Sequence, residues 1–349
     1  MSLKRGTWLL VLLCGVLLIG GCTKTEAEKE ENVEETKDKL EIGMSFDSFV
    51  IERWQRDRDV FVSAAKELGA EVNVQNANGE VEEQIKQIEY FIDKKVDVIV
   101  IVSIDGEKLV SSVAAAKKAG IKVIAYDRPI KYADADLYIS FDNEAVGRMM
   151  AEALQQEIGG AGKIIMLSGP TSDSNVTMVN AGFMSIAKRY QNEIVDIHYA
   201  EGWLAEEAYN YINDNPIKVA DADAIMCGND NLAGQAIKAL SEQRLAGKIP
   251  VVGQDAELEA CQRIVEGTQL MTVYKPVEKL AKAAAEYAVM LARGEDLGIE
   301  DTYMEGAYEI PCVTLTPIKV TKSNMDEVVI NSGFHLKEDV YMNVTPPTE

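Results

Sequence analysis

The sequence predicts an α/β fold in which two parallel sheets, each covered by helices, face one another across a central cleft. Three observations lead to this fold class. From Leu40 onward, short runs rich in Val and Ile alternate with stretches of helical length. The two halves of the chain repeat a similar order of segments. Residues 40–349 are also long for one domain and comfortable for two.

The apolar runs have the composition of parallel strands that are buried on both faces. Helical stretches lie between them, from Trp54 to Leu68 and from Gly79 to Asp93, and a third ends before Gly120, a residue favoured just past a helix C-terminus. This alternation implies parallel sheets with helices on both faces. We expect strands at Glu41–Ser45, Glu71–Gln75, Val96–Val102, Lys122–Ala125, Lys163–Leu167, Ala222–Met226 and Val251–Gly253.

The two halves of the chain match each other segment by segment. Asp97-Val-Ile-Val in the first half resembles Asp223-Ala-Ile-Met in the second, and each precedes a loop and a helix. Likewise, Lys122–Asp127 resembles Pro250–Asp255, and both segments end in Asp. Ligands of open α/β sheets bind beyond the carboxyl ends of the strands. Two facing sheets would place both sets of strand ends around one cleft.

The N-terminus has the features of a bacterial lipoprotein signal. Lys4 and Arg5 precede the apolar stretch Trp8–Ile19, which is short for a membrane span and typical of a signal peptide over residues 1–21. Leu18–Cys22 matches a lipobox, so we expect Cys22 to be acylated and the protein to be held on the extracytoplasmic face of the cell membrane. An uncleaved apolar anchor is the alternative. The charged segment 22–39 is expected to be a flexible tether, or otherwise an isolated charged helix.

Composition and missing motifs exclude several classes of function. Asp and Glu outnumber Lys and Arg by 57 to 35, which argues against nucleic acid as a partner. Beyond the signal, Cys227, Cys261 and Cys312 are too few and too widely spaced for a disulfide framework or zinc site, and we expect them to be buried. Only two His residues occur, and no nucleophile elbow or dinucleotide fingerprint is found. We therefore expect a binding protein, not an enzyme, with no cofactor and no metal.

One glycine-rich segment resembles a phosphate-binding loop only superficially. In Gly159-Gly-Ala-Gly-Lys163, Ile164 stands where such a loop needs Ser or Thr. The Lys also leads into an expected strand rather than a helix. We expect no nucleotide site here.

The polar and aromatic residues that follow the expected strands form an inventory suited to a neutral sugar. Each sugar hydroxyl is both a donor and an acceptor, so it pairs well between a carboxylate and an Arg, Lys or amide N–H. The C–H faces of a pyranose can lie against an indole ring. Three acids balance three bases, as buried charges require. The candidate ligand-binding residues are Arg53, Trp54, Asp127, Arg128, Asp173, Asn175, Trp203, Asn229, Asp255 and Lys275.

Some of these residues have a structural alternative. Trp54 opens a helix and could pack in the core, whereas Trp203 follows Glu201-Gly202 in a loop and is better explained by ligand stacking. Asp127 could cap a helix, or Arg128 beside it could be the main contact. We expect Asp230 to cap the following helix rather than to contact sugar.

With these residues in place, the sequence resembles the ribose/galactose/xylose branch of the type I periplasmic binding proteins, from about Leu40 to about Leu336. The Glu-Arg-Trp and Met-Thr-Val-Tyr-Lys-Pro segments point to D-xylose rather than ribose. The loop Ser168–Asn175 departs most from the family pattern. The resemblance is carried by Glu52–Asp59, Gln75–Gly79, Ala125–Arg128, Tyr138–Asn143, Gly202–Leu204, Gly253–Asp255, Gly267–Gln269 and Met271–Pro276.

The resemblance implies six of the candidates as sugar contacts, with Trp54 and Asp127 as neighbours in the pocket. Asp173 and Asn175 rest on their position in the departing loop. These six implied contacts are Arg53, Arg128, Trp203, Asn229, Asp255 and Lys275.

The resemblance also implies the architecture, the mechanism and the partners. Two Rossmann-like lobes are joined by three chain crossings, with residues 40–140 plus 276–310 in the N-terminal lobe and 141–275 plus 312–336 in the C-terminal lobe and crossing tail. Sugar binding would favour a hinge-closed form that docks on the membrane subunits of an ABC permease. The alternative is a sensor whose closed form docks on a membrane histidine kinase. A repressor core shares the fold but conflicts with the signal peptide.

Overall fold

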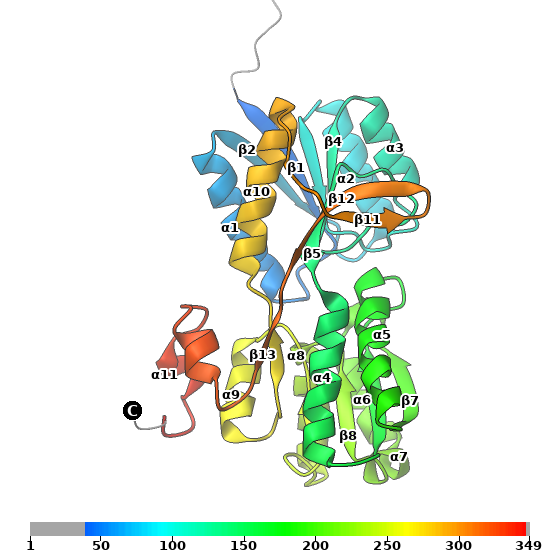
Figure 1. The fold of residues 1–349 in the computed structure, drawn as a ribbon, viewed down its shortest axis with the longest axis vertical. Helices are drawn as coiled ribbons and strands as arrows, with labels where there is room; N and C mark the ends of the chain where they lie inside the picture. The colour runs from blue at the N-terminus through cyan, green and yellow to red at the C-terminus, as the bar shows by residue number, and fades with distance from the viewer. Residues whose placement is uncertain (1–38, 347–349) are drawn as a thin grey trace, which may run out of the picture. The chain divides into compact units, whose positions relative to one another are not determined.

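The computed structural model describes residues 39–346. The expected signal peptide, Cys22 and all of the tether except Lys39 lie outside the described residues. The described chain contains two large sheets, each with helices packed on it (Figure 1). The predicted α/β class of two largely parallel sheets is confirmed.

The first sheet has seven strands in the order β11-β12-β5-β4-β3-β1-β2, and all neighbouring pairs are parallel except the β11–β12 hairpin. Its strands are β1 (Leu40–Phe46), β2 (Ala70–Asn76), β3 (Val98–Ile101), β4 (Lys122–Tyr126), β5 (Leu137–Phe141), β11 (Thr302–Glu305) and β12 (Tyr308–Leu315). Its helices are α1 (Arg53–Glu67), α2 (Val81–Asp93), α3 (Val110–Lys118) and α10 (Val277–Arg293).

The alternation of side chains along β3 explains why this sheet is covered on both faces. Val98 and Val100 belong to the same buried cluster as Phe61 of α1 and Ala284 of α10. Ile99 and Ile101 point to the opposite face, where they join a second cluster with residues of α2 and α3. A strand buried on both faces needs apolar residues at every position, which is the pattern seen in the sequence.

The second sheet has four parallel strands in the order β7-β6-β8-β9. They are β6 (Lys163–Ser168), β7 (Glu193–Tyr199), β8 (Ala224–Cys227) and β9 (Val251–Val252). Its helices are α4 (Asn143–Ile158), α5 (Ser174–Arg189), α6 (Glu206–Asp214), α7 (Pro216–Ala220), α8 (Asp230–Glu242) and α9 (Leu258–Glu266), with the 3-10 turn η1 (Glu201–Trp203).

The glycine-rich segment before β6 ends a helix. Gly159 follows α4 with φ at +73° and its backbone N–H bonds to the carbonyl of Gln155, so it is a left-handed C-cap. Lys163 begins β6 and pairs with Asp221 at 2.7 Å. The expectation that this segment is not a phosphate-binding loop agrees with its geometry.

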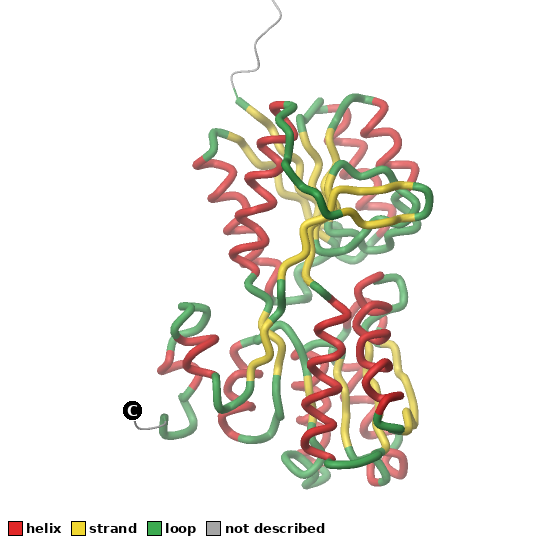
Figure 2. Tube along the Cα trace, viewed as in Figure 1, coloured by secondary structure: helices red, strands yellow, loops and turns green. Residues whose placement is uncertain are grey.

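The chain passes between the two sheets after Phe141, after Tyr274 and after Leu315. Two of these passages form a small antiparallel pair, β10 (Thr272–Tyr274) with β13 (Ile318–Val320), which lie beside each other in Figure 2. Beyond β13 the chain forms the π-helical turn η2 (Asp326–Ile330) and α11 (Lys337–Val340).

The structure corrects one predicted boundary. The residues from Cys312 onward were assigned to the second lobe and the crossing tail, but Cys312–Leu315 pair with Tyr138–Phe141 in the first sheet. The reason is that β12 is longer than its apolar residues suggest and inserts as a parallel neighbour of β5. The chain leaves the first sheet only after Leu315.

Cys227, Cys261 and Cys312 are free and buried. Among residues 39–346, no cluster of three or more His, Cys, Asp or Glu side chains is arranged to hold a metal ion. Within the same range, every helix is too short or too polar to cross a bilayer.

Candidate ligand-binding site

The ten candidate residues all line one pocket at the carboxyl ends of the strands of both sheets. The pocket holds about 450 Å³ of empty space, counting the part open to solvent. The structure adds eight residues to its lining that the sequence did not single out: Ile51, Gly169, Val176, Val179, Asn180, Met226, Gly228 and Gln254.

The three acids and three bases of the pocket form three ion pairs. Arg53 Nη1 lies 2.8 Å from Asp127 Oδ2, and Arg128 Nε lies 2.8 Å from Asp173 Oδ2. Lys275 Nζ lies 3.2 Å from Asp255 Oδ1. All six side chains are at least nine-tenths buried. Each predicted base is therefore paired directly with one predicted acid, as buried charges require. The predicted balance of three acids against three bases is nevertheless incomplete, because two more buried carboxylates contact the same guanidinium groups.

Two further acids, which the sequence analysis missed, hold the guanidinium groups. Asp57 accepts hydrogen bonds from Arg53 Nε at 3.2 Å and Nη2 at 2.9 Å, and Tyr126 Oη donates to the same carboxylate. Asp47 accepts from Arg128 Nη1 at 2.7 Å, and the same nitrogen donates to the carbonyl of Ser103. Each guanidinium is thus fixed by two carboxylates.

The electrostatic environment keeps Asp127 ionised. Burial alone would raise the pKa of Asp127, but the positive charges of Arg53, Lys275 and Arg128 bring it below its ordinary value. Asp127 therefore remains an acceptor for a ligand hydroxyl at neutral pH. Its backbone lies in the left-handed region, with φ at +65°, as do those of Trp203 and Asp255 at +58° and +98°. Such strained residues cluster at binding sites.

Two polar contacts join the ends of the two sheets. Asn175 Nδ2, in the first turn of α5, donates to Asp127 Oδ1 at 2.8 Å. The ion pair of Arg128 with Asp173 makes the second link. Asp173 is also the N-cap of α5, accepting from the backbone N–H of Asn175 at 2.9 Å. The loop Ser168–Asn175, which departs most from the family pattern, therefore places both of its predicted residues, Asp173 and Asn175, in the pocket.

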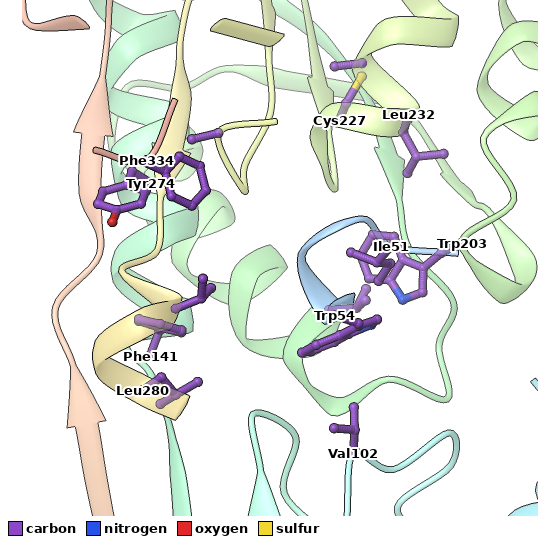
Figure 3. Close-up of a cluster of buried hydrophobic side chains, with 14 of the residues drawn as sticks. Ile51, Trp54, Val102, Phe141, Trp203, Cys227, Leu232, Tyr274, Leu280 and Phe334 are labelled. Atoms are coloured by element: carbon purple, nitrogen blue, oxygen red, sulfur yellow. The ribbon is translucent and has the colours of Figure 1, made fainter. Parts of the chain in front are cut away.

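The two tryptophans belong to the buried cluster and lie beside Ile51 (Figure 3). Trp203 donates from Nε1 to Asp173 at 3.2 Å. Its ring lies so close to Gly169 and Gly228 that a Cβ on Gly169 would overlap it and one on Gly228 would crowd it. The Trp203 ring therefore packs against the backbones of two glycines, which leave room for it and explain its position in the loop.

Trp54 has both of the roles that the sequence left open. It packs against Phe46 with ring centroids 6.2 Å apart, and it lines the pocket. The guanidinium of Arg53 lies 4.3 Å from the centroid of its ring.

Six buried polar atoms of residues that line the pocket make no hydrogen bond within residues 39–346. Two of them, Arg128 Nε and Asp255 Oδ1, lie in the ion pairs described above, and the other four belong to neutral side chains. Trp54 Nε1 and Asn229 Nδ2 are donors, whereas Asn175 Oδ1 and Gln254 Oε1 are acceptors. Buried polar groups are nearly always paired, so unpaired donors and acceptors in one pocket indicate a ligand that offers both functions. A polyol has this property at every hydroxyl.

The structure corrects the expectation that Asp230 caps α8. The cap is Asn229, which accepts from the backbone N–H of Leu232 at 2.8 Å. Asp230 is the first residue of the helix and is held by Thr272 Oγ1, Gln269 Nε2 and the backbone N–H of Glu257. It does not line the pocket.

The chain was compared with known protein families and curated proteins. The periplasmic binding protein domain family matches residues 42–296. The chain is 43% identical to the D-xylose-binding periplasmic protein of Escherichia coli K12, over 95% of this chain and 98% of that protein. It is 44% identical to the D-xylose-binding periplasmic protein of Haemophilus influenzae, over 86% and 92% of the two chains. These relatives are binding proteins rather than enzymes.

Two solved structures of solute-binding proteins are also similar to this chain. A Clostridium phytofermentans ABC transporter solute-binding protein with bound β-D-glucose has a TM-score of 0.78 at 27% identity, covering 86% of this chain and 99% of its own. A Chloroflexus aurantiacus carbohydrate transporter solute-binding protein in complex with D-glucose has a TM-score of 0.77 at 26% identity, with 86% and 98% covered. The chain belongs to the periplasmic binding protein family and has its type I fold.

Proposed function

We propose that this protein binds D-xylose in the pocket described above and presents it to an ABC importer. The observation that carries the proposal is the set of unpaired donors and acceptors at Trp54, Asn229, Asn175 and Gln254, which a sugar would satisfy. The three ion pairs supply charged partners for further hydroxyls. The relatives named as D-xylose-binding proteins support this pentose as the ligand.

The ten predicted residues are proposed as the ligand contacts, each with a role set by its chemistry. Asp127, Asp173 and Asp255 accept from sugar hydroxyls, while Arg53, Arg128 and Lys275 donate. Trp203 and Trp54 stack against the C–H faces of the ring. Asn175 and Asn229 provide the free amide atoms noted above.

We further propose that the sugar closes a hinge between the two lobes. The contacts of Asn175 with Asp127 and of Arg128 with Asp173 each join residues from the ends of different sheets. A sugar that touches both sides favours the closed form by the free energy of the contacts made only in that form. The lobes are proposed to comprise residues 40–140 with 276–315, and 141–275 with the tail that follows residue 315.

The binding experiment is a calorimetric titration of the chain from residue 23 onward with xylose, glucose, ribose and arabinose. The proposal expects tight binding of xylose and a loss of at least about 100-fold in Trp203→Ala, since a stacked aromatic removed from a buried site costs about 3 kcal/mol or more. Tight binding of glucose instead of xylose would show that the ligand is glucose, while the assignment of the pocket would stand. Binding of none of the four would reject a sugar receptor.

The partner is tested in cells. If the protein serves an importer, deleting it is expected to abolish high-affinity xylose uptake. An importer as the partner is supported by the glucose-bound ABC transporter solute-binding protein among the structural relatives. Unchanged uptake combined with a lost transcriptional response to xylose would instead assign it to a membrane sensor kinase.

We also propose that Cys22 is acylated after cleavage of residues 1–21, so that the protein is anchored to the outer side of the cell membrane. The mass of the mature protein tests this step directly. Cys22→Ser is expected to remove the lipid mass and to release the protein from the membrane fraction. A variant that keeps both the mass and the fractionation of the parent protein would reject it.

A further inference from the structure

The C-terminal segment Thr321–Val344 packs against the rest of the described chain. Met325, Val329 and Val340 are buried in the same cluster as the core of both sheets. Gln262 Nε2 of α9 donates to the carbonyl of Asp339 at 2.8 Å. Phe334 and His335 lie next to each other at the bend between η2 and α11, with ring centroids 4.5 Å apart.

Phe334 ties this bend to the helix that carries Arg53. Arg56, one turn after Arg53 on α1, donates to the Phe334 carbonyl at 3.0 Å, and its guanidinium lies 4.2 Å from the centroid of the Phe334 ring. The Phe334 ring also packs against Tyr274, with ring centroids 4.7 Å apart and the ring planes tilted by 60° (Figure 3). Arg56 is itself held by Glu278 of α10 at 2.9 Å. Phe334 is therefore an anchor with a fixed position.

His335 holds the turn that carries Asp255. Its Nε2 lies 2.8 Å from the carbonyl oxygen of Ala256, and since a carbonyl only accepts, Nε2 carries the proton. Asp255 and Ala256 are consecutive non-glycine residues in the left-handed region, with φ at +98° and +54°. Such a turn is strained and persists only if its surroundings hold it. Other contacts also hold this turn. Val273 O, Thr272 Oγ1 and Asp230 Oδ2 accept from the backbone N–H groups of Asp255, Ala256 and Glu257, and Cys261 Sγ donates to the Ala256 carbonyl at 3.6 Å.

A second hollow borders the Asp255 turn on the side of Phe334 and His335. It lies behind the pocket, holds about 740 Å³ of empty space including the part open to solvent, and shares Arg53 and Asp255 with the pocket itself. Phe334, His335 and Arg56 also line it. Arg53 and Asp255 thus border the hollow, although both side chains are more than nine-tenths buried.

From this arrangement we propose that His335 is a positioning residue for the sugar site: anchored by Phe334 to the helix that bears Arg53, it fixes the Asp255 turn in the conformation that presents the carboxylate to the ligand. The inference rests on the proposed sugar-binding function. His335 itself touches no ligand, because it does not line the pocket.

The test compares three variants of the purified protein. His335→Leu keeps the bulk and removes the donor, whereas His335→Gln retains an amide N–H at the distance of Nε2. Xylose affinity is expected to fall by about 10-fold or more in His335→Leu, as for other lost buried hydrogen bonds, and to stay within about threefold of the parent in His335→Gln. Gln262→Ala is the matched control: it removes a hydrogen bond to the same tail away from the site and should lower stability while leaving affinity unchanged.

Backbone hydrogen exchange supplies a readout that needs no ligand. The amides of residues 255–257 are expected to exchange faster in His335→Leu than in the parent or in His335→Gln, while amides in the middle of α9 stay unchanged. Equal affinity of His335→Leu and the parent, or equal losses in the Leu and Gln variants, would overturn the positioning role. If the parent protein binds no sugar, the proposed function fails, and the exchange rates alone decide the inference: unchanged exchange at 255–257 overturns it.

Discussion

The side-chain amide of Asn175 donates a hydrogen bond of 2.8 Å to the carboxylate of Asp127, although the two residues follow strands of different sheets. The same nitrogen also lies 3.2 Å from the backbone carbonyl of Asp127. Arg53 contacts the other carboxylate oxygen. One buried acid is thus shared between a base from its own side of the pocket and an amide from the other side.

This contact predicts the effect of Asn175→Ala. The substitution removes a hydrogen bond to a charged group and the free acceptor Oδ1, so xylose affinity should fall by about 10-fold or more, corresponding to about 1.5–3 kcal/mol. Titration calorimetry measures the change. Asn213→Ala, a similar truncation on α6 away from the pocket, is the control and should bind as the parent does. An Asn175→Ala variant with parental affinity would show that the contact across the pocket adds nothing to binding.

The pairing of Arg128 predicts a large effect on stability. Arg128→Met leaves Asp47 and Asp173 buried without their cation, so the free energy of unfolding should fall by about 3–5 kcal/mol. Arg148→Met is the matched control, because Arg148 pairs with Asp142 and Glu144 on the surface and should cost less than about 1 kcal/mol. Denaturant unfolding of both variants checks the difference. Equal losses would mean that the buried pairs contribute no more than exposed ones.

The pocket could be predicted well from the sequence because its parts follow local rules. Parallel strands place their carboxyl ends at one edge, so a polar residue just after a strand is a candidate whatever the rest of the fold does. This rule also covers Asp47, which directly follows β1 and was overlooked. Asp57 has a different signal, since it lies four residues after Arg53 on one helix face and forms an i,i+4 ion pair.

Other contacts missed by sequence reasoning lie between distant segments. Tyr308–Leu315 has mixed exposure, so its polar positions hide a strand whose parallel partner, β5, lies far back in the chain. The contact of His335 with Ala256 spans 79 residues and is made by a backbone carbonyl. Neither feature has a periodicity or motif that a sequence could reveal.

A third prediction concerns pH and the buried acids beside the Asp255 turn. Burial, with the nearby charges of Asp230, Asp255 and Glu52, raises the pKa of Glu257 to about 9, and burial raises the pKa of Asp230 to about 7. Both groups keep a proton in the folded protein at pH values where the unfolded chain has lost it. The folded state therefore binds more protons, and stability falls as pH rises from 4.5 to about 9.

Glu257→Gln tests this assignment, because the amide cannot ionise. The parent protein should lose on the order of a few kcal/mol of unfolding free energy across this window. The variant should lose clearly less above pH 7, where only Glu257 still titrates. Glu259→Gln changes an exposed acid on the same helix and should leave the pH dependence as it is in the parent. Identical pH profiles for the parent and Glu257→Gln would show that Glu257 is ionised throughout.

The last prediction concerns the spacing of α4 and α5. A Cβ at Gly147 would overlap the backbone of Val179 and Phe183, and one at Gly182 would overlap the backbone carbonyl of Glu144, so the two helix backbones touch through glycine. Gly147→Ala must push α5 away from α4 and should lower the free energy of unfolding by about 1–3 kcal/mol, despite the better helix propensity of Ala.

Because α5 begins at Ser174 with Asn175 in its first turn, this shift should also weaken xylose binding. Gly160→Ala is the control: a Cβ there meets no atom within 4 Å, so stability and affinity should stay near those of the parent. Denaturant unfolding and titration of both variants separate the two effects. A Gly147→Ala protein that is destabilised but binds normally would show that α5 tilts about its N-terminus, leaving Asn175 in place, rather than moving as a whole.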